Sequence, residues 1–238
     1  ATSHADRRYS TLSRQLYVSD GPVSSMVQSG NTLYVGGTFQ HVGPATGTAA
    51  SLDPATGLPI SLPMVDGSVN AIVGDGSGGW YIGGNFMHVG GAPRTRLAHI
   101  MSDGTVAAWN PVANGFVTSL ATTNGLVFVG GNFTNIGGVP KHYLAELDGY
   151  TGQPWNWGPE PNGQVSALAI SGNTLWVGGS FTNISSAPSN NIAAVDIYSG
   201  VASAWNPNAD QSVSTIVYNG GPLLVAGSFA NIGGRTRR

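Results

Sequence analysis

The chain has 238 residues and a formal net charge of −2, with only 8% charged residues and 36 glycines. Helical bundles and coiled coils are excluded, because glycine weakens helix interiors and there are too few Lys and Glu to solvate helix faces. A hydrophobic content of 41% at low net charge argues against disorder. Nine Lys plus Arg give no broad basic surface, so we expect no nucleic-acid partner.

Two absences narrow the class of protein further. The chain has no cysteine, which excludes disulfides, thiolate metal sites and a cysteine nucleophile. No apolar run reaches the roughly 20 residues that a membrane-spanning helix needs, so we expect no membrane insertion. The first residue is Ala rather than Met, as expected of a processed or excised chain from which any signal peptide has been removed.

A short motif recurs along the whole chain at an almost constant interval. The motif is Gly-Gly-x-Phe, with Ala-Gly in the last copy, and its phenylalanines are Phe39, Phe86, Phe133, Phe181 and Phe229. The spacing between successive phenylalanines is about 48 residues, and it varies by a single position. A repeat of this length indicates that one small unit of secondary structure is used five times.

Each repeat contains four short apolar stretches separated by turn residues. The first begins at a valine, and these valines are Val23, Val69, Val117, Val165 and Val213. The second runs into the Gly-Gly pair, and the third is an apolar-Ala-x-apolar stretch, usually followed by Asp, as at 144–148 and 192–196. The fourth ends near Leu62, Trp109, Trp155 and Trp205. Four strands in a repeat of this length are typical of a β-propeller blade.

We therefore predict an all-β, five-bladed β-propeller with four antiparallel strands per blade, as a single domain over residues 1–238. The interval from Phe229 through Arg238 and on to Phe39 matches the other intervals. This predicts a ring closed by pairing of the N- and C-terminal strands, in which residues 1–20 complete the blade begun at about 213–238. Such closure hides strand edges. A piece of a longer repeat array, with ends that match by chance, is the alternative.

The repeat also resembles a known family. The pattern Tyr-Val-Gly-Gly-x-Phe-x-x-Ile-Gly-Gly, followed by Leu-Ala-x-Leu-Asp, Thr-Gly and Trp-Asn-Pro, is similar to the delta-60-type β-propeller repeats of bacterial secreted and surface proteins. Similar repeats occur in fungal cortical polarity markers. The resemblance covers nearly the whole chain, although residues 1–20 match weakly and Ala226 departs from the glycine pair. It implies a secreted or cell-surface repeat protein, and it implies no particular activity.

Five oxygen-bearing side chains share one repeat position, three residues before each first strand. They are Asp20, Asp66, Asn114, Asn162 and Asp210. We expect them at the mouth of the central channel, where such oxygens could ligate Ca²⁺ or another cation. The alternative is turn chemistry, because Asp-Gly and Asn-Gly favour tight turns.

Three of these five residues are carboxylates from consecutive blades of the closed ring: Asp20, Asp66 and Asp210. Paired carboxylates can act as acid and base in a glycoside hydrolase or lyase, which is a less favoured alternative. The blades lack the inserted loops that would build a substrate pocket. We therefore expect no enzymatic activity and no cofactor beyond such a cation.

Two further sets of loop residues could bind a ligand. The first set is Trp109, Asn110, Trp155, Asn156, Trp157, Trp205 and Asn206. Sugars stack on aromatic rings while amides bond their hydroxyls, although these Trp rings could instead fill blade–blade contacts. Among them Trp157 is expected to be the exposed one. The second set is basic, with Arg94, Lys141 and Arg237 as candidates for an acidic glycan or partner protein, or simply as solvated charges.

The sequence thus predicts a non-enzymatic, extracellular or cell-surface binding and scaffolding module. Comparable loops on one face of the ring could bind a glycan multivalently, since weak contacts add up when they are linked. A surface protein is the other partner class. The main alternative is a purely structural or assembly subunit of a larger surface protein.

Overall fold

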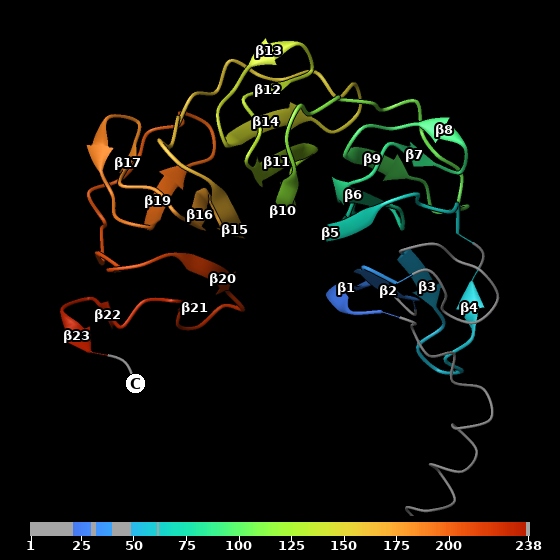
Figure 1. Cartoon of the computed structure of the whole chain (residues 1–238), viewed down its shortest axis with the longest axis horizontal. Helices are drawn as coiled ribbons and strands as arrows, with labels where there is room; N and C mark the ends of the chain where they lie inside the picture. Colours follow the sequence, from blue (N-terminus) through green and yellow to red (C-terminus); the bar gives the residue numbers. More distant parts are fainter. Residues whose placement is uncertain (1–20, 30–31, 40–48, 61, 237–238) are drawn as a thin grey trace, which may run out of the picture.

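The computed structural model describes residues 21–29, 32–39, 49–60 and 62–236, and its regular elements there are all β-strands. Five successive sheet-containing units follow one another along an arc (Figure 1). The first unit holds β1 (Val23–Ser29), β2 (Thr32–Gly37), β3 (Ala49–Leu52) and β4 (Pro59–Ile60). In the part of the chain that the structure describes, no helix is long and apolar enough to cross a membrane.

In the second, third and fourth units a small hairpin stands between the second and third strands, and the described part of the fifth unit holds two longer strands and such a hairpin. The second holds β5 (Ser68–Gly74), β6 (Trp80–Asn85), β7 (His88–Val89), β8 (Ala92–Pro93) and β9 (Leu97–Ile100). The third holds β10 (Val117–Thr123), β11 (Leu126–Gly131), β12 (Asn135–Ile136), β13 (Val139–Pro140) and β14 (Leu144–Asp148). The fourth holds β15 (Val165–Ser171), β16 (Thr174–Gly179), β17 (Asn183–Ile184), β18 (Ala187–Pro188) and β19 (Ile192–Asp196). The fifth holds β20 (Val213–Val217), β21 (Leu224–Gly227), β22 (Asn231–Ile232) and β23 (Arg235–Thr236).

Within each complete unit the first three predicted strands form an antiparallel sheet, in orders such as β10-β11-β14 and β15-β16-β19. The predicted fourth strand is present as β4 in the first unit. In the next three units it shrinks to a single antiparallel bridge, at Val106, Pro154 and Ala202. Pro154 has no backbone N–H, so it cannot donate a hydrogen bond to the neighbouring strand.

The small hairpins after the second strands were not foreseen from the sequence. In β12–β13 the turn residues are Gly137 and Gly138, with φ of 59° and 80°. Two consecutive positive φ angles are what a two-residue hairpin turn of type I′ requires. The fourth unit makes the same turn with Ser185 and Ser186 in place of the two glycines.

The first glycine of each pair lets the next unit approach closely, and the second lets backbone of its own unit do so. A Cβ on Gly130 would lie 2.6 Å from Cγ1 of Val165, the first-strand valine of the next unit. A Cβ on Gly131 would strike the backbone oxygen of Phe116. Val165 is consequently buried, as are its repeat partners Val69, Val117 and Val213. Val23, which follows no described unit, is 46% exposed.

The first strands of all five units converge on one central cavity of about 360 Å³. Its wall includes Met26, Ala71, Thr118, Leu168 and Ile216, one from each first strand. Cross-unit bonds help to hold this arrangement, because Thr118 Oγ1 donates to the Val165 carbonyl at 2.6 Å. The fold is therefore all-β and propeller-like, as predicted. The predicted pairing of the chain ends falls on residues 1–20, which lie outside the described residues.

Candidate functional site

The buried tryptophans mark the boundaries between units. Trp109 Nε1 donates to the Asp148 carbonyl at 3.1 Å, and Trp157 Nε1 donates to the Asp196 carbonyl at 3.4 Å. Each bond spans 39 residues and joins one unit to the third strand of the next. Trp109 packs on Tyr81 and Trp157 packs on Phe128, with ring centroids 5.0 and 5.2 Å apart. These two rings fill the unit boundaries.

The expectation that Trp157 is the exposed tryptophan was wrong. Trp157 is 3% exposed, whereas Trp155 is 51% exposed. Trp157, not Trp155, is the repeat equivalent of Trp109 and Trp205, since these three residues are evenly spaced along the chain. Each of them begins a Trp-x-Pro sequence, and this proline was the signal that could have identified the equivalent residues. Trp155 is the additional residue.

A surface pocket of about 420 Å³ lies at the boundary between the third and fourth units. We call it the Trp155 pocket. Its lining residues are Asn124, Leu126, Glu146, Trp155, Asn156, Trp157 and Tyr198. An apolar pocket with a few polar groups is the usual form of a small-molecule site. Of its residues, only the three consecutive ones from Trp155 to Trp157 were predicted from the sequence.

Local turn chemistry positions the polar and aromatic side chains of this pocket. Asn124 and Gly125 make the two-residue turn between β10 and β11, with φ of 51° and 75°. Tyr198 follows Asp196, whose Oδ1 accepts hydrogen bonds from Tyr198 N at 3.1 Å and from Ser199 N at 2.7 Å. Asn124 Nδ2 then donates to the Tyr198 hydroxyl at 3.2 Å, across the boundary. Such Asx turns fix the chain where the third strand ends.

Glu146 supplies the only carboxyl group among the residues that line this pocket. It lies on β14 opposite Phe128 of β11, and it is 6% exposed. Burial raises the pKa of Glu146 to about 7, while the positive charge of Lys141 opposes that rise. Lys141 is itself buried, and its Nζ donates to the Trp157 carbonyl at 2.7 Å. Trp155 N donates to the Glu146 carbonyl at 2.9 Å.

The predicted basic residues are bonded within the fold. Lys141 donates to Trp157, and Arg94 Nη1 donates to the Pro93 carbonyl at 2.7 Å. Arg94 Nη2 also donates to the Ala107 carbonyl. These bonds tie the loop after the second strand to the chain that leads toward the next unit. Arg237 lies outside the described residues, so the three positions are not brought together by anything the structure describes.

Four of the five residues predicted to ring the channel mouth accept hydrogen bonds from loop backbone within their own units. Asn114 Oδ1 accepts from Thr134 N and Asn135 N at 2.8 and 2.9 Å, and Asn162 does the same with Thr182 and Asn183. Asp66 accepts from Met87 N and His88 N, and Asp210 accepts from Ala230 N and Asn231 N. Hydrogen bonds from Asn231 lower the pKa of Asp210.

Each of these bonds fastens the residue before a first strand to the loop after the second strand. Among the described residues, no group of three or more His, Asp or Glu side chains could hold a metal ion. Asp20 lies outside the described residues. The cation site and the carboxylate-based hydrolase, which both include Asp20, therefore stay predictions.

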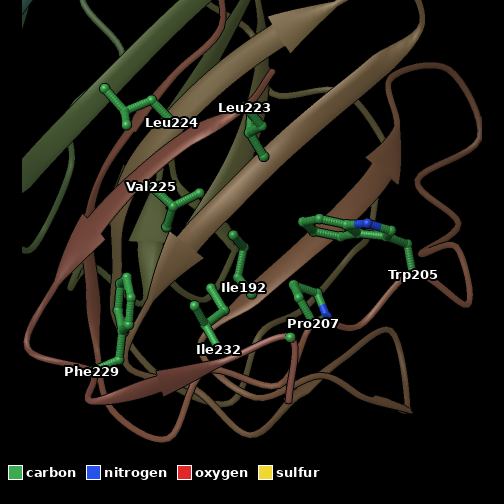
Figure 2. A pocket seen from close by; sticks show the side chains of 9 residues that line it. Ile192, Trp205, Pro207, Leu223, Leu224, Val225, Phe229 and Ile232 are labelled. Carbon is green, nitrogen blue, oxygen red and sulfur yellow. The ribbon is translucent and has the colours of Figure 1, made fainter. Parts of the chain in front are cut away.

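An apolar groove of about 520 Å³ lies between the fourth and fifth units. Figure 2 shows Ile192, Ile232 and Pro207 between the rings of Trp205 and Phe229. Trp205 is 38% exposed and packs edge-on against Trp176, with the two ring centroids 4.7 Å apart. Among the described residues β21 pairs only with β20 and has no third strand on its other side. We call this space the terminal groove.

The three Trp/Asn segments therefore do not form three equivalent sites. Trp109 is buried beside exposed Asn110, and Trp205 faces the terminal groove. Asn206 is exposed, and its Nδ2 donates to the Pro188 carbonyl at 3.2 Å. Only Trp155, Asn156 and Trp157 line one pocket together.

Comparisons with known proteins agree on the fold. A family model described as "Domain of unknown function (DUF5122) beta-propeller" matches residues 76–106. No curated protein matches the chain. A chain of the mitotic checkpoint complex superposes with a TM-score of 0.63 at 17% identity, over 87% of this chain and 59% of that one.

Two further solved structures are similar. The computationally designed Ika8 protein superposes with a TM-score of 0.58 at 16% identity, over 91% of this chain and 60% of that one. The extracellular domain of a putative one-component system from B. thetaiotaomicron gives 0.55 at 17% identity, over 88% of this chain and 27% of that one. This chain thus spans at most 60% of the length of these three solved chains. At these identities the likeness concerns the fold alone, and the chain is similar to proteins of β-propeller architecture.

Proposed function

We propose that this protein is a non-enzymatic binding module, secreted or on a cell surface, that binds a saccharide in the Trp155 pocket. The observation that carries the proposal is the half-exposed Trp155 ring at a pocket that also holds Asn124, Asn156 and Tyr198. A large exposed aromatic side chain has an apolar face that can cover one face of a sugar ring. The amide and hydroxyl groups can bond its hydroxyls.

An extracellular location is part of this proposal. It is supported by the likeness to the extracellular domain of a bacterial one-component system and by the resemblance of the repeats to those of secreted and surface proteins. Because only 8% of the residues are charged, we expect the ligand to be uncharged as well.

The proposed ring of five blades would hold the pocket in a fixed place. In the third unit the third strand starts at Leu144, and in the fourth unit it starts at Ile192. Each start lies the same number of residues before the first valine of the following unit, which is Val165 or Val213. Counting the same number of residues back from Val23 gives Thr2 as the proposed start of the third strand of the fifth unit. In that register Ser3 would pair with Val225, as Ala193 pairs with Val177 in the fourth unit.

The terminal groove and the partly exposed Trp205 support this closure, because a third strand covers the equivalent surface of the fourth unit. A disulfide can test the register, since the chain has no cysteine of its own. The double variant Ser3→Cys with Val225→Cys should form an intramolecular disulfide on mild oxidation, because strand partners lie within disulfide reach. Ser10→Cys with Val225→Cys is the matched control. Equal cross-linking of both pairs, or of neither, would contradict closure in this register.

The second candidate function is assembly into a larger surface structure, which the apolar terminal groove favours. In that case a strand from another chain would occupy the groove and add to the edge of β21.

Binding to a glycan array, followed by titration calorimetry of the bound saccharides, tests the saccharide proposal. The variants are Trp155→Ala and Tyr150→Ala. Tyr150 is a highly exposed aromatic residue at the turn equivalent to that of Tyr198, but it does not line the pocket. We expect saccharide binding to be lost in Trp155→Ala and kept in Tyr150→Ala. Absence of saccharide binding, or equal binding by both variants, would reject the proposal.

A further inference from the structure

Glu146 is mostly buried, but it lines the Trp155 pocket, and its carboxyl oxygens are not among the solvent-inaccessible unpaired atoms of the described residues. Among the described residues, the Glu146 carboxyl makes no hydrogen bond and no ion pair, although it is 6% exposed. Its repeat equivalent in the second unit, His99, bonds Asp75 at 2.9 Å. The equivalent in the fourth unit is Ala194, which needs no partner. A carboxylate that has lost most of its water, has no protein donor and stays open to a pocket points to a ligand.

The chemistry of a carboxylate defines what it needs. It accepts hydrogen bonds through two oxygens and donates none when it is ionised. The protein removes most of the water around the Glu146 carboxyl, and donors from a ligand would restore the interactions that were lost with that water. Two adjacent hydroxyl groups of a sugar can donate to the two oxygens together, as the bidentate partners of a carboxylate do.

The charges of an ionised Glu146 and of Lys141 sum to zero, which favours an uncharged ligand over a charged one. An ionised Glu146 repels an acidic sugar. Lys141 lies close enough to influence the Glu146 carboxyl, and its ammonium is bound to the carbonyl of Trp157, a residue of the pocket. This buried positive charge disfavours a cationic ligand. The other titratable group that lines the pocket is Tyr198, whose hydroxyl accepts from Asn124 and can still donate its proton.

We infer that Glu146 is the acceptor that makes the Trp155 pocket select uncharged saccharides with two adjacent hydroxyl groups. This inference rests on the proposed function. The sugar ring would lie on Trp155 and direct two hydroxyl protons to the Glu146 oxygens. No covalent step is involved. Because the hydroxyls donate to the ionised carboxylate, affinity should rise with pH as Glu146 loses its proton near neutrality.

Titration calorimetry on the full chain tests this inference with four trisaccharide probes. Cellotriose and mannotriose are uncharged, the N-trimethylated glucosamine trimer is cationic at every pH used, and trigalacturonate is anionic. We expect at least one uncharged probe to bind more tightly than either charged one, and Glu146→Gln to weaken that binding at least tenfold at pH 8. Wild-type affinity should increase between pH 6 and 8, and Glu146→Gln should abolish this dependence.

The control variant is Glu160→Gln, an exposed residue outside the pocket, which should bind like wild type. Tight binding of an uncharged probe that depends on Trp155 but is unchanged in Glu146→Gln would overturn the role of Glu146 and leave the proposed function standing. Preferential, Trp155-dependent binding of a charged probe would overturn the ligand class alone. Binding of none of the four probes would count against both.

Discussion

The boundary between the third and fourth units and the boundary between the fourth and fifth units carry tryptophans at the same repeat position, but these tryptophans differ in burial. At the first boundary Trp157 is covered by the third strand of the next unit and donates to the Asp196 carbonyl. At the second, Trp205 occupies the same repeat position, but no third strand of the fifth unit lies among the described residues. It borders a groove instead. A boundary is therefore completed only when the third strand of the next unit is in place.

The largest expected effect comes from removing the two tryptophans. Trp157→Ala should destabilise the protein by about 3–5 kcal/mol, because a large buried ring and its hydrogen bond are lost. If residues 1–20 close the ring, Trp205→Ala should cost the same within about 1 kcal/mol in the full chain. Urea denaturation followed by tryptophan fluorescence and circular dichroism measures both. A cost for Trp205→Ala below about 2 kcal/mol would contradict closure.

A smaller effect should follow from filling the close approach between units. Gly130→Ala should destabilise by about 2–3 kcal/mol, since its Cβ would overlap Val165 at a tightly packed contact. The matched change is Ala226→Gly, at the position where the fifth unit already carries a methyl group. It should alter stability by less than about 1 kcal/mol. Equal unfolding midpoints for Gly130→Ala and wild type would show that the boundary is not closely packed.

The smallest of the three effects concerns Glu146 and depends on pH. Folding raises the pKa of this carboxyl from 4.5 to about 7, so its ionisation is less favourable in the folded protein. Its contribution to stability is therefore complete below pH 4.5 and is lost as the pH rises toward 7. Glu146→Gln should thus be more stable than wild type by about 1–2 kcal/mol at pH 8.

The difference between Glu146→Gln and wild type should vanish near pH 4, and thermal unfolding across this range would reveal it. His99 occupies the equivalent position in the second unit and is bonded to Asp75, so His99→Gln offers a contrasting variant. An unchanged difference from pH 4 to 8 would mean that Glu146 is more solvated than its burial indicates.

The repeat made much of the fold predictable from sequence. The glycine pairs and first-strand valines recur at fixed intervals, because the same close contact is built at each boundary. The length of the fourth strand was overestimated, since in the second, third and fourth units it pairs through a single bridge, at Val106, Pro154 and Ala202. The prediction that Trp157 is exposed was wrong because Trp-x-Pro, and not Trp-Asn, is the sequence that recurs at the repeat interval.

The candidate pocket was harder to foresee than the fold. Asn124 comes from a hairpin turn, Glu146 from a third strand and Tyr198 from a turn of the next unit. Nothing in the spacing of these residues indicates that they meet, because their proximity depends on how two units pack. One signal was available: Glu146 is the only acidic residue at a position otherwise held by Ser51, His99 and Ala194.

The hydrogen bond between Asn124 and Tyr198 has a consequence for any attempt to transplant the pocket. Since its two ends belong to different repeats, a graft of the third repeat alone would lack the Tyr198 hydroxyl. The smallest portable piece is a tandem pair, third repeat followed by fourth. Engineers who wish to multiply the site around a designed ring would have to alternate these two sequences rather than copy one.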